Sequence, residues 1–178
     1  MNQNLNSIRN LCYIGIFVAI ISVLSQIAIP LPGGVPMTLG TFSIAFAAAI
    51  LGAKRGATAA IVYVLLGTIG VPVFANFNGG FHAVLGPTGG FILSYPIMAF
   101  IIGFGADKKR ATRLWLAFAL VIGSLVNLSM GTVQFAFVGE HSLMTAFRFA
   151  FAPFIVVEMV KMGMVFLIAP EAKRLVWR

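Results

Sequence analysis

Six apolar runs, separated by short breaks, dominate the chain. They cover residues 11–29, 37–52, 57–73, 91–106, 114–138 and 149–169. The runs are continuously apolar and lack the alternation of period two that is typical of transmembrane barrel strands. About 20 apolar residues are enough for one helix to cross a bilayer. The pattern therefore predicts an all-α membrane protein, a single bundle of six transmembrane helices formed by residues 1–178.

Two of the runs, 37–52 and 57–73, are short for a full span, so we expect their helices to be tilted, partly buried or bordered by thinned lipid. The chain has 60% hydrophobic and 9% charged residues among its 178, and a soluble domain could not bury so much apolar surface. The first run resembles a signal peptide but is too long for one and lacks an A-x-A-like site, so we expect a retained helix.

The breaks between the runs are of two kinds, and these kinds alternate. Residues 30–36 and 71–90 are rich in Pro and Gly, whereas Lys54-Arg55 and residues 107–113 are basic. With both termini in the cytoplasm, nearly all basic residues lie inside and Arg148 lies in an outer loop, as the positive-inside rule requires. The predicted inner set is Arg9, Lys54, Arg55, Lys108, Lys109, Arg110, Arg113, Lys173, Arg174 and Arg178, with Trp115 and Trp177 near the inner interface.

This distribution predicts a multi-pass protein of the cell membrane, with lipid around it. The net charge of +8 then reports topology, and it does not indicate nucleic-acid binding.

Glu158 and Lys161 lie inside the last apolar run, where a charge is costly. Ionisable groups near the middle of a membrane helix cost about 2.5–3.5 kcal/mol each on insertion scales, so they are rare and usually functional. The spacing i, i+3 places both on one helix face. Two interpretations follow: a polar ligand site, or an ion pair that locks helix packing.

A glycine-rich segment, residues 76–90, forms the second candidate site. Its glycines allow close approach to a ligand, Asn78 offers a donor and an acceptor, and Phe77 offers an apolar wall. The alternative is a plain connector whose glycines only make turns. In the six-helix topology this segment and the entrance of the last helix at Pro153 share the outer face, so the loop and the charged pair converge there.

Other motifs add little chemistry. The sequence lacks a G-x-x-x-x-G-K-[ST] phosphate loop, and its two histidines, His82 and His141, are isolated. We therefore predict no metal, no cofactor and no catalytic residues. Gly15 and Ala19 form a small-xxx-small step on the first helix, which predicts either ordinary packing in the bundle or a partner surface.

Several segments resemble one known family. They are Val35-Pro36-Met37-Thr38-Leu39, Leu51-Gly52-Ala53-Lys54-Arg55-Gly56-Ala57, residues 63–74, Asn78-Gly79-Gly80, residues 85–91 and, after Pro153, Glu158-Met159-Val160-Lys161. In order and spacing they are similar to the BioY family, the biotin-specific S component of energy-coupling factor (ECF) transporters. The resemblance implies a prokaryotic membrane subunit, not an enzyme, that binds biotin at the outer face. It would deliver biotin to a coupling transmembrane protein driven by two ATPase subunits.

The resemblance also implies residue roles. Asn78 and Glu158 would face the ureido ring, and Lys161 would face the carboxylate tail. The remaining binding residues would be Gly79, Gly80, Phe77, Phe91 and Tyr95, while Gly15 and Ala19 would dock on the coupling protein. Three positions depart from the family: Glu158 stands where Asp is more common, Gly40 replaces a commonly polar residue, and Ile92 stands where some members carry Arg.

Three rival interpretations stay open from the sequence. The first is an S component whose ligand is another small vitamin or a biotin precursor. A membrane enzyme that uses Glu158 as general acid or base is the second. The third is a purely structural or self-assembling pore, in which apolar residues could replace the charged pair.

Overall fold

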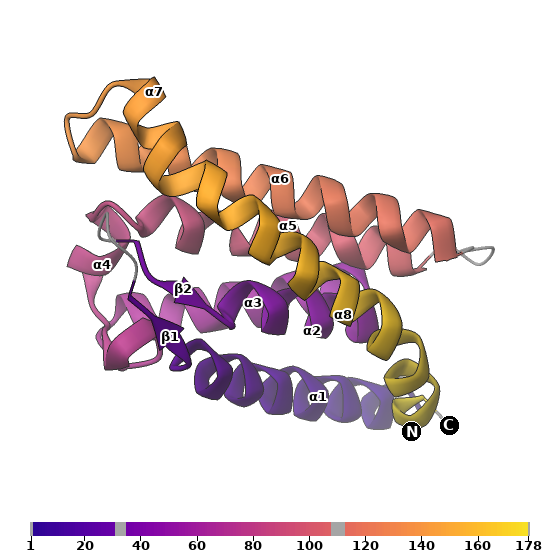
Figure 1. Cartoon of the computed structure of the whole chain (residues 1–178). Coiled ribbons are helices and arrows are strands. Elements are labelled where there is room, and N and C mark those ends of the chain that lie inside the picture. The colour runs from indigo at the N-terminus through magenta and orange to yellow at the C-terminus, as the bar shows by residue number, and fades with distance from the viewer. Residues whose placement is uncertain (1, 31–34, 108–112, 178) are drawn as a thin grey trace.

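The computed structural model describes residues 2–30, 35–107 and 113–177, with side chains from Ile8 onward. Each apolar run lies largely in helix in this part of the chain, although the helices do not match the six predicted spans one for one (Figure 1). The long helices are α1 (Asn2–Ser25), α2 (Gly40–Leu51), α3 (Ala53–Thr68), α5 (Gly89–Asp107), α6 (Arg113–Val138) and α8 (Ala152–Val176). The short elements are η1 (Ala75–Phe77), α4 (Phe81–Leu85), α7 (Leu143–Ala146) and the π-helical turn η2 (Phe147–Phe151).

Four helical stretches among the described residues are long and apolar enough to cross a membrane. They are Ile8–Ser25, Gly89–Asp107, Arg113–Val138 and Leu143–Val176, and the last joins α7, η2 and α8. The fold is therefore mostly helical, with four candidate spans and two shorter helices, α2 and α3.

A small antiparallel pair of strands departs from the all-α prediction. Strand β1 (Ala28–Ile29) pairs with β2 (Met37–Thr38), with Ala28 opposite Thr38 and Ile29 opposite Met37. The residue before a proline is pushed toward extended backbone, and Ile29 precedes Pro30. The first and second apolar runs therefore include short strands that hydropathy alone does not separate from helix.

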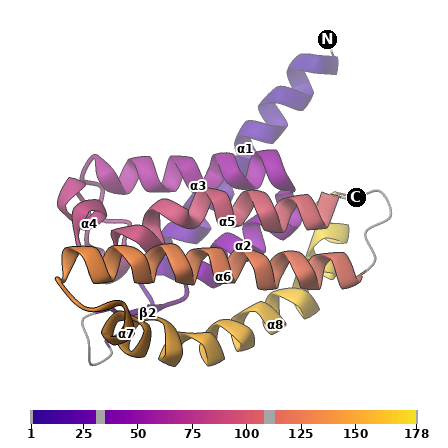
Figure 2. The ribbon, with the colours of Figure 1, turned by 90° about the horizontal axis from the view of Figure 1, so that it is seen from above.

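Helix α2 lies in the interior of the bundle. Its 12 residues span about 18 Å, well short of a hydrocarbon core of about 30 Å. Ala45, Ala47, Ala48 and Ala49 are all buried. These small side chains let α1, α3, α5 and α8 pack around it (Figure 2). Of the three alternatives for run 37–52, burial in the bundle is the one that the structure shows.

The two kinds of break lie at opposite ends of the bundle. Figure 1 places β1, β2, α4 and α7 at one end, and the first turn of α1, the last turn of α8 and the α2–α3 junction at the other. The prediction that Pro/Gly-rich and basic breaks lie at opposite ends is confirmed for the breaks at β1–β2, at α4 and at the α2–α3 junction. Lys108, Lys109, Arg110 and Arg178 lie outside the described residues.

Polar contacts tie several helices together at the basic end. The Trp177 indole Nε1 donates to the Ile50 carbonyl at 3.0 Å, and the Arg55 guanidinium lies 4.6 Å from the centre of the same ring. Asp107, at the end of α5, accepts a hydrogen bond from the Ala53 amide at 2.7 Å. This contact satisfies one of the free amides at the start of α3, as a capping side chain would.

We predict that Asp107→Ala lowers the free energy of unfolding by about 1 kcal/mol, the usual value of a helix cap. Asp107→Asn keeps an acceptor oxygen and loses only the exposed pairing with Lys173, 3.9 Å away, so it should stay close to the parent protein. Unfolding titrations in detergent would measure both variants. Equal stability of the Ala and Asn variants would contradict the cap.

Candidate functional site

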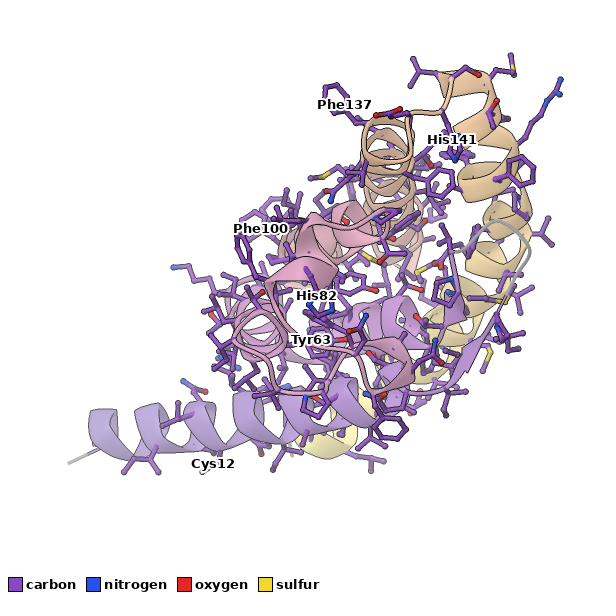
Figure 3. All side chains as sticks on the ribbon, turned by 90° about the vertical axis from the view of Figure 1, so that its left-hand side faces the viewer. Cys12, Tyr63, His82, Phe100, Phe137 and His141 are labelled. Carbon is purple, nitrogen blue, oxygen red and sulfur yellow. The ribbon has the colours of Figure 1, made fainter. Side chains whose placement is uncertain are left out.

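A cavity of about 430 Å³ opens at the Pro/Gly-rich end of the bundle. Its lining comes from the end of α1, from α2, α3, α4, α5, α6 and α8, from the turns before α2 and before α5, and from the segment at η1. The volume falls within the range of small-molecule sites. Figure 3 looks onto this end, with His82 and Tyr63 near its middle and His141 away from them. Among the described residues, His, Cys, Asp and Glu form no group of three or more that could hold a metal ion.

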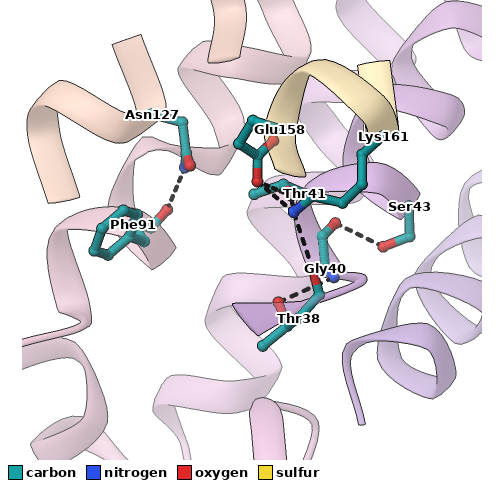
Figure 4. A network of polar contacts seen from close by, with 8 residues as sticks. All are labelled: Thr38, Gly40, Thr41, Ser43, Phe91, Asn127, Glu158 and Lys161. Carbon is teal, nitrogen blue, oxygen red and sulfur yellow. Dashed lines mark hydrogen bonds and ion pairs between the residues drawn. The ribbon is translucent and has the colours of Figure 1, made fainter. Parts of the chain in front are cut away.

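The charged pair lies in the wall of this cavity and is almost fully buried. Glu158 is 4% and Lys161 5% exposed, although both line the cavity. The Lys161 ammonium donates to Glu158 Oε1, to Thr41 Oγ1 and to the Thr38 carbonyl, the last at 3.1 Å (Figure 4). An ammonium has three donors, so all of those on Lys161 are engaged.

Thr41 connects the two charged groups. Its hydroxyl accepts from Lys161 and donates to Glu158 Oε1 at 2.7 Å. Glu158 Oε1 therefore takes two hydrogen bonds, while Oε2 is buried and has no partner among the described residues. The network fixes the carboxylate and leaves one of its oxygens available as an acceptor.

Aromatic side chains form much of the remaining wall. The rings of Tyr63 and Tyr95 have centroids 6.1 Å apart, and those of Phe91 and Phe154 6.3 Å. Phe74 meets Tyr63 edge to face at 5.6 Å. Ile92 is also part of this wall. Such a surface suits an apolar ring and a methylene chain.

Gly67 is required for the position of Phe74. A Cβ atom on Gly67 would lie 2.1 Å from the Phe74 ring, so only glycine permits this approach. Gly67 of α3 thus determines where Phe74 lies, and Phe74 in turn lines the cavity.

The glycine-rich loop contributes to the mouth of the cavity only in part. Phe77 and Asn78 line it, whereas Gly79 and Gly80 are outside the lining. A Cβ on Gly79 would meet the Val71 carbonyl oxygen at 2.5 Å, and Gly80 has φ of 101°. These two glycines shape the turn that presents Asn78. The Asn78 Oδ1 accepts from the Gly79 amide at 2.9 Å and lies 3.2 Å from His82 Nε2.

Gly15 and Ala19 are on the outer surface of α1. Both are exposed, and a Cβ on Gly15 would meet nothing within 4 Å. The N-terminal part of α1 projects beyond the other helices (Figures 2 and 3). This small-residue step is therefore not used for packing within the described bundle, and the structure does not bring it to the cavity.

Six of the eight binding residues expected from the sequence line one cavity: Phe77, Asn78, Phe91, Tyr95, Glu158 and Lys161. Sequence reasoning missed Thr38, Thr41 and Asn127, which also line it. Asn127 carried a usable signal, because it is a polar amide within the apolar run 114–138. Thr38 lies within residues 35–39, a segment that resembles the family.

Comparison with known proteins gives a consistent result. The model of the BioY family matches residues 1–178. A biotin transporter BioY from Thermotoga maritima is 39% identical over 168 residues, covering 94% of this chain and 97% of that protein. A probable biotin transporter BioY from Pyrococcus horikoshii is 38% identical, covering 90% and 94%. The crystal structure of the S-component for biotin from an ECF-type ABC transporter matches with a TM-score of 0.86 at 24% identity, covering 96% and 94%. At 24% identity, this match shows that the two proteins share a fold and nothing further.

Proposed function

This chain belongs to the BioY family, and from that premise we propose that it binds biotin as the substrate-specific membrane subunit of an ECF-type transporter. The observation that carries the proposal is the buried Glu158 carboxylate, held by Lys161 and Thr41, with Oε2 free in a cavity of ligand size. The relatives are named as transporters, which leaves the enzyme alternative without support among them.

The chemistry of biotin matches this site. Its ureido ring offers two N–H donors, and an ionised carboxylate is a strong acceptor for them. The aromatic wall of Phe91 and Tyr95 suits the thiophane ring and the methylene chain, while Asn78 at the mouth can pair with polar edges of the ligand. We propose that Glu158 accepts a ureido N–H.

The role of Lys161 toward the carboxylate tail carries a condition. Because its three donors are engaged, a ligand carboxylate has to take over one of them. Energetics favour this exchange at the Thr38 carbonyl, because that partner is a neutral backbone group at 3.1 Å, whereas a hydrogen bond from the ammonium to a ligand carboxylate joins two charged groups and is stronger. Lys161 would keep its contact with Glu158 throughout.

For the membrane we propose a bundle of six helices with both termini in the cytoplasm of a prokaryotic cell. Supporting this, four helical stretches among the described residues are long enough to span, and the α2–α3 junction lies at the end opposite the cavity mouth, where Arg9 and Arg55 lie over the Trp177 ring. The mouth would then face outward, and residues 1–178 would act as one substrate-binding unit. The partners we propose are a coupling transmembrane protein and two ATPase subunits, with Gly15 and Ala19 on the docking face of α1.

Titration of the purified, folded protein with biotin in an isothermal calorimeter tests the function directly. We expect saturable binding with one ligand per chain, and biotin to co-purify and be identified by mass spectrometry. Competition by dethiobiotin or by an unrelated vitamin such as riboflavin separates biotin from a precursor or another vitamin. Absence of binding heat for protein that is folded by circular dichroism would refute the proposal.

A further inference from the structure

Asn127 on α6 is a buried amide with one half of its hydrogen-bonding capacity unused. The residue is 1% exposed and lines the cavity. Its Nδ2 donates to the Phe91 carbonyl at 3.0 Å and to Ser94 Oγ at 2.7 Å, both on α5. Its Oδ1 has no partner among the described residues.

The partners on α5 fix the orientation of this amide. The Phe91 carbonyl can only accept, so it requires the amide nitrogen of Asn127. The Ser94 hydroxyl donates its proton to the same carbonyl at 2.9 Å, so toward Asn127 its oxygen also accepts. Turning the amide over would bring Oδ1 against two acceptors. Oδ1 therefore points away from α5.

Leaving such an oxygen unpaired costs free energy, and buried polar groups in native proteins are nearly always paired. Glu158 Oε2, from α8, is a second buried and unpaired acceptor in the lining of the same cavity (Figure 4). Asn127 on α6 and Glu158 on α8 thus each bring a buried acceptor without a partner among the described residues to the wall of one cavity, and donors on a ligand in that cavity would satisfy both.

We propose that Asn127 is a second recognition residue, whose Oδ1 accepts one ureido N–H of the ligand while Glu158 Oε2 accepts the other. The inference rests on the proposed function and narrows its ligand class to cyclic ureas with both nitrogens unsubstituted. The two N–H bonds of such a ring point outward from opposite sides, so one acceptor can serve each. Biotin and dethiobiotin meet this requirement, and a ring methylated on either nitrogen does not.

The structural role of Asn127 as a tether between α6 and α5 has to be separated from recognition. The test uses biotin and its two derivatives methylated on one or the other ureido nitrogen, titrated against the parent protein and Asn127→Ala. We expect Asn127→Ala to weaken biotin about ten- to a hundredfold, because a ligand N–H loses its partner. One of the two derivatives carries its methyl group on the nitrogen whose N–H Asn127 accepts. For that derivative, the loss of affinity relative to biotin should be much smaller in Asn127→Ala than in the parent, because the variant no longer has the acceptor.

Gln134→Ala is the matched control. Gln134 is also an amide on α6, and it tethers α6 to the Val84 and Gly86 carbonyls at 2.8 and 2.9 Å without lining this cavity. We expect it to lower thermal stability and leave biotin affinity within a factor of about two, since only a structural contact is lost.

Each outcome decides the inference. A uniform loss for all three ligands in Asn127→Ala, or an equal loss in Gln134→Ala, makes Asn127 a tether only and overturns it. If Asn127→Ala does not fold, the parent alone decides, because a methylated derivative that binds as tightly as biotin overturns the use of both N–H groups. A parent protein that does not bind biotin removes the proposed function together with this inference, whereas unchanged biotin affinity in Asn127→Ala removes the inference alone.

Discussion

Replacing Lys161 with Met is expected to lower the free energy of unfolding by about 3–5 kcal/mol, the usual loss when one partner of a buried ion pair is removed. Glu158 would remain 4% exposed without its cation, and Thr41 would be left as its only donor among the described residues. The Thr38 carbonyl would lose a donor as well. Titration with denaturing detergent in mixed micelles would measure the change.

Arg174→Met provides the matched control on the same helix. Arg174 pairs with Glu171 at 3.0 Å and with the same spacing, i, i+3, but this pair is exposed to solvent. Exposed pairs contribute about 0–1 kcal/mol, so this variant should stay within that range. The double variant Glu158→Gln/Lys161→Met should recover most of the stability lost in Lys161→Met, because no unpaired charge stays buried. Similar unfolding curves for Lys161→Met and Arg174→Met would show that removing Lys161 costs no more stability than removing one partner of an exposed pair.

Glu158→Gln is expected to weaken biotin binding by about a hundredfold or more, in the range for truncating one partner of a buried charged hydrogen bond. The size of the side chain hardly changes. Its oxygen can still accept from Lys161 and Thr41, and its amide nitrogen then replaces Oε2 and points a donor at the ligand. A donor facing a ureido N–H leaves both groups unpaired, which is the strongest form of rejection in a buried site.

Calorimetric titration of this variant against the parent gives the result, with Glu171→Gln as an exposed control on α8 that should not change the affinity. Glu158→Asp separates charge from reach, because it keeps a carboxylate and shortens the side chain by one methylene. We expect a smaller loss of biotin affinity than for Glu158→Gln. Biotin affinity in Glu158→Gln equal to that of the parent would place ureido recognition elsewhere in the cavity.

Much of the candidate site was predictable because a buried charge in an apolar run is conspicuous. Glu158 and Lys161 stand out within residues 149–169. The same reasoning applied to residues 114–138 would have selected two amides, Asn127 and Gln134, of which only Asn127 lines the cavity. The partners of Lys161 were beyond such reasoning. Thr38 and Thr41 lie 123 and 120 positions earlier in the chain, and nothing local in the sequence relates them to α8.

The glycine-rich loop shows the opposite limit. Glycines at 79 and 80 predicted close approach to a ligand, yet close approach to the chain's own backbone at Val71 and a positive φ require glycine equally. The short strands β1 and β2 were likewise hidden, because their residues are as apolar as the helices on either side.

The sequence by itself determined the apolar runs that become helices, the segregation of basic and Pro/Gly-rich breaks to opposite ends, and the helix that carries charge. These features follow from the transfer free energy of successive residues, which is local and adds along the chain. Only the tertiary structure decided that Lys161 donates all three of its hydrogen bonds to groups of the protein and that the side-chain oxygen of Asn127 points away from α5. It also decided that both residues line one cavity with Glu158. Those outcomes depend on atoms brought within about 3 Å by the packing of helices far apart in sequence, and a hydrogen bond has no strength at longer range.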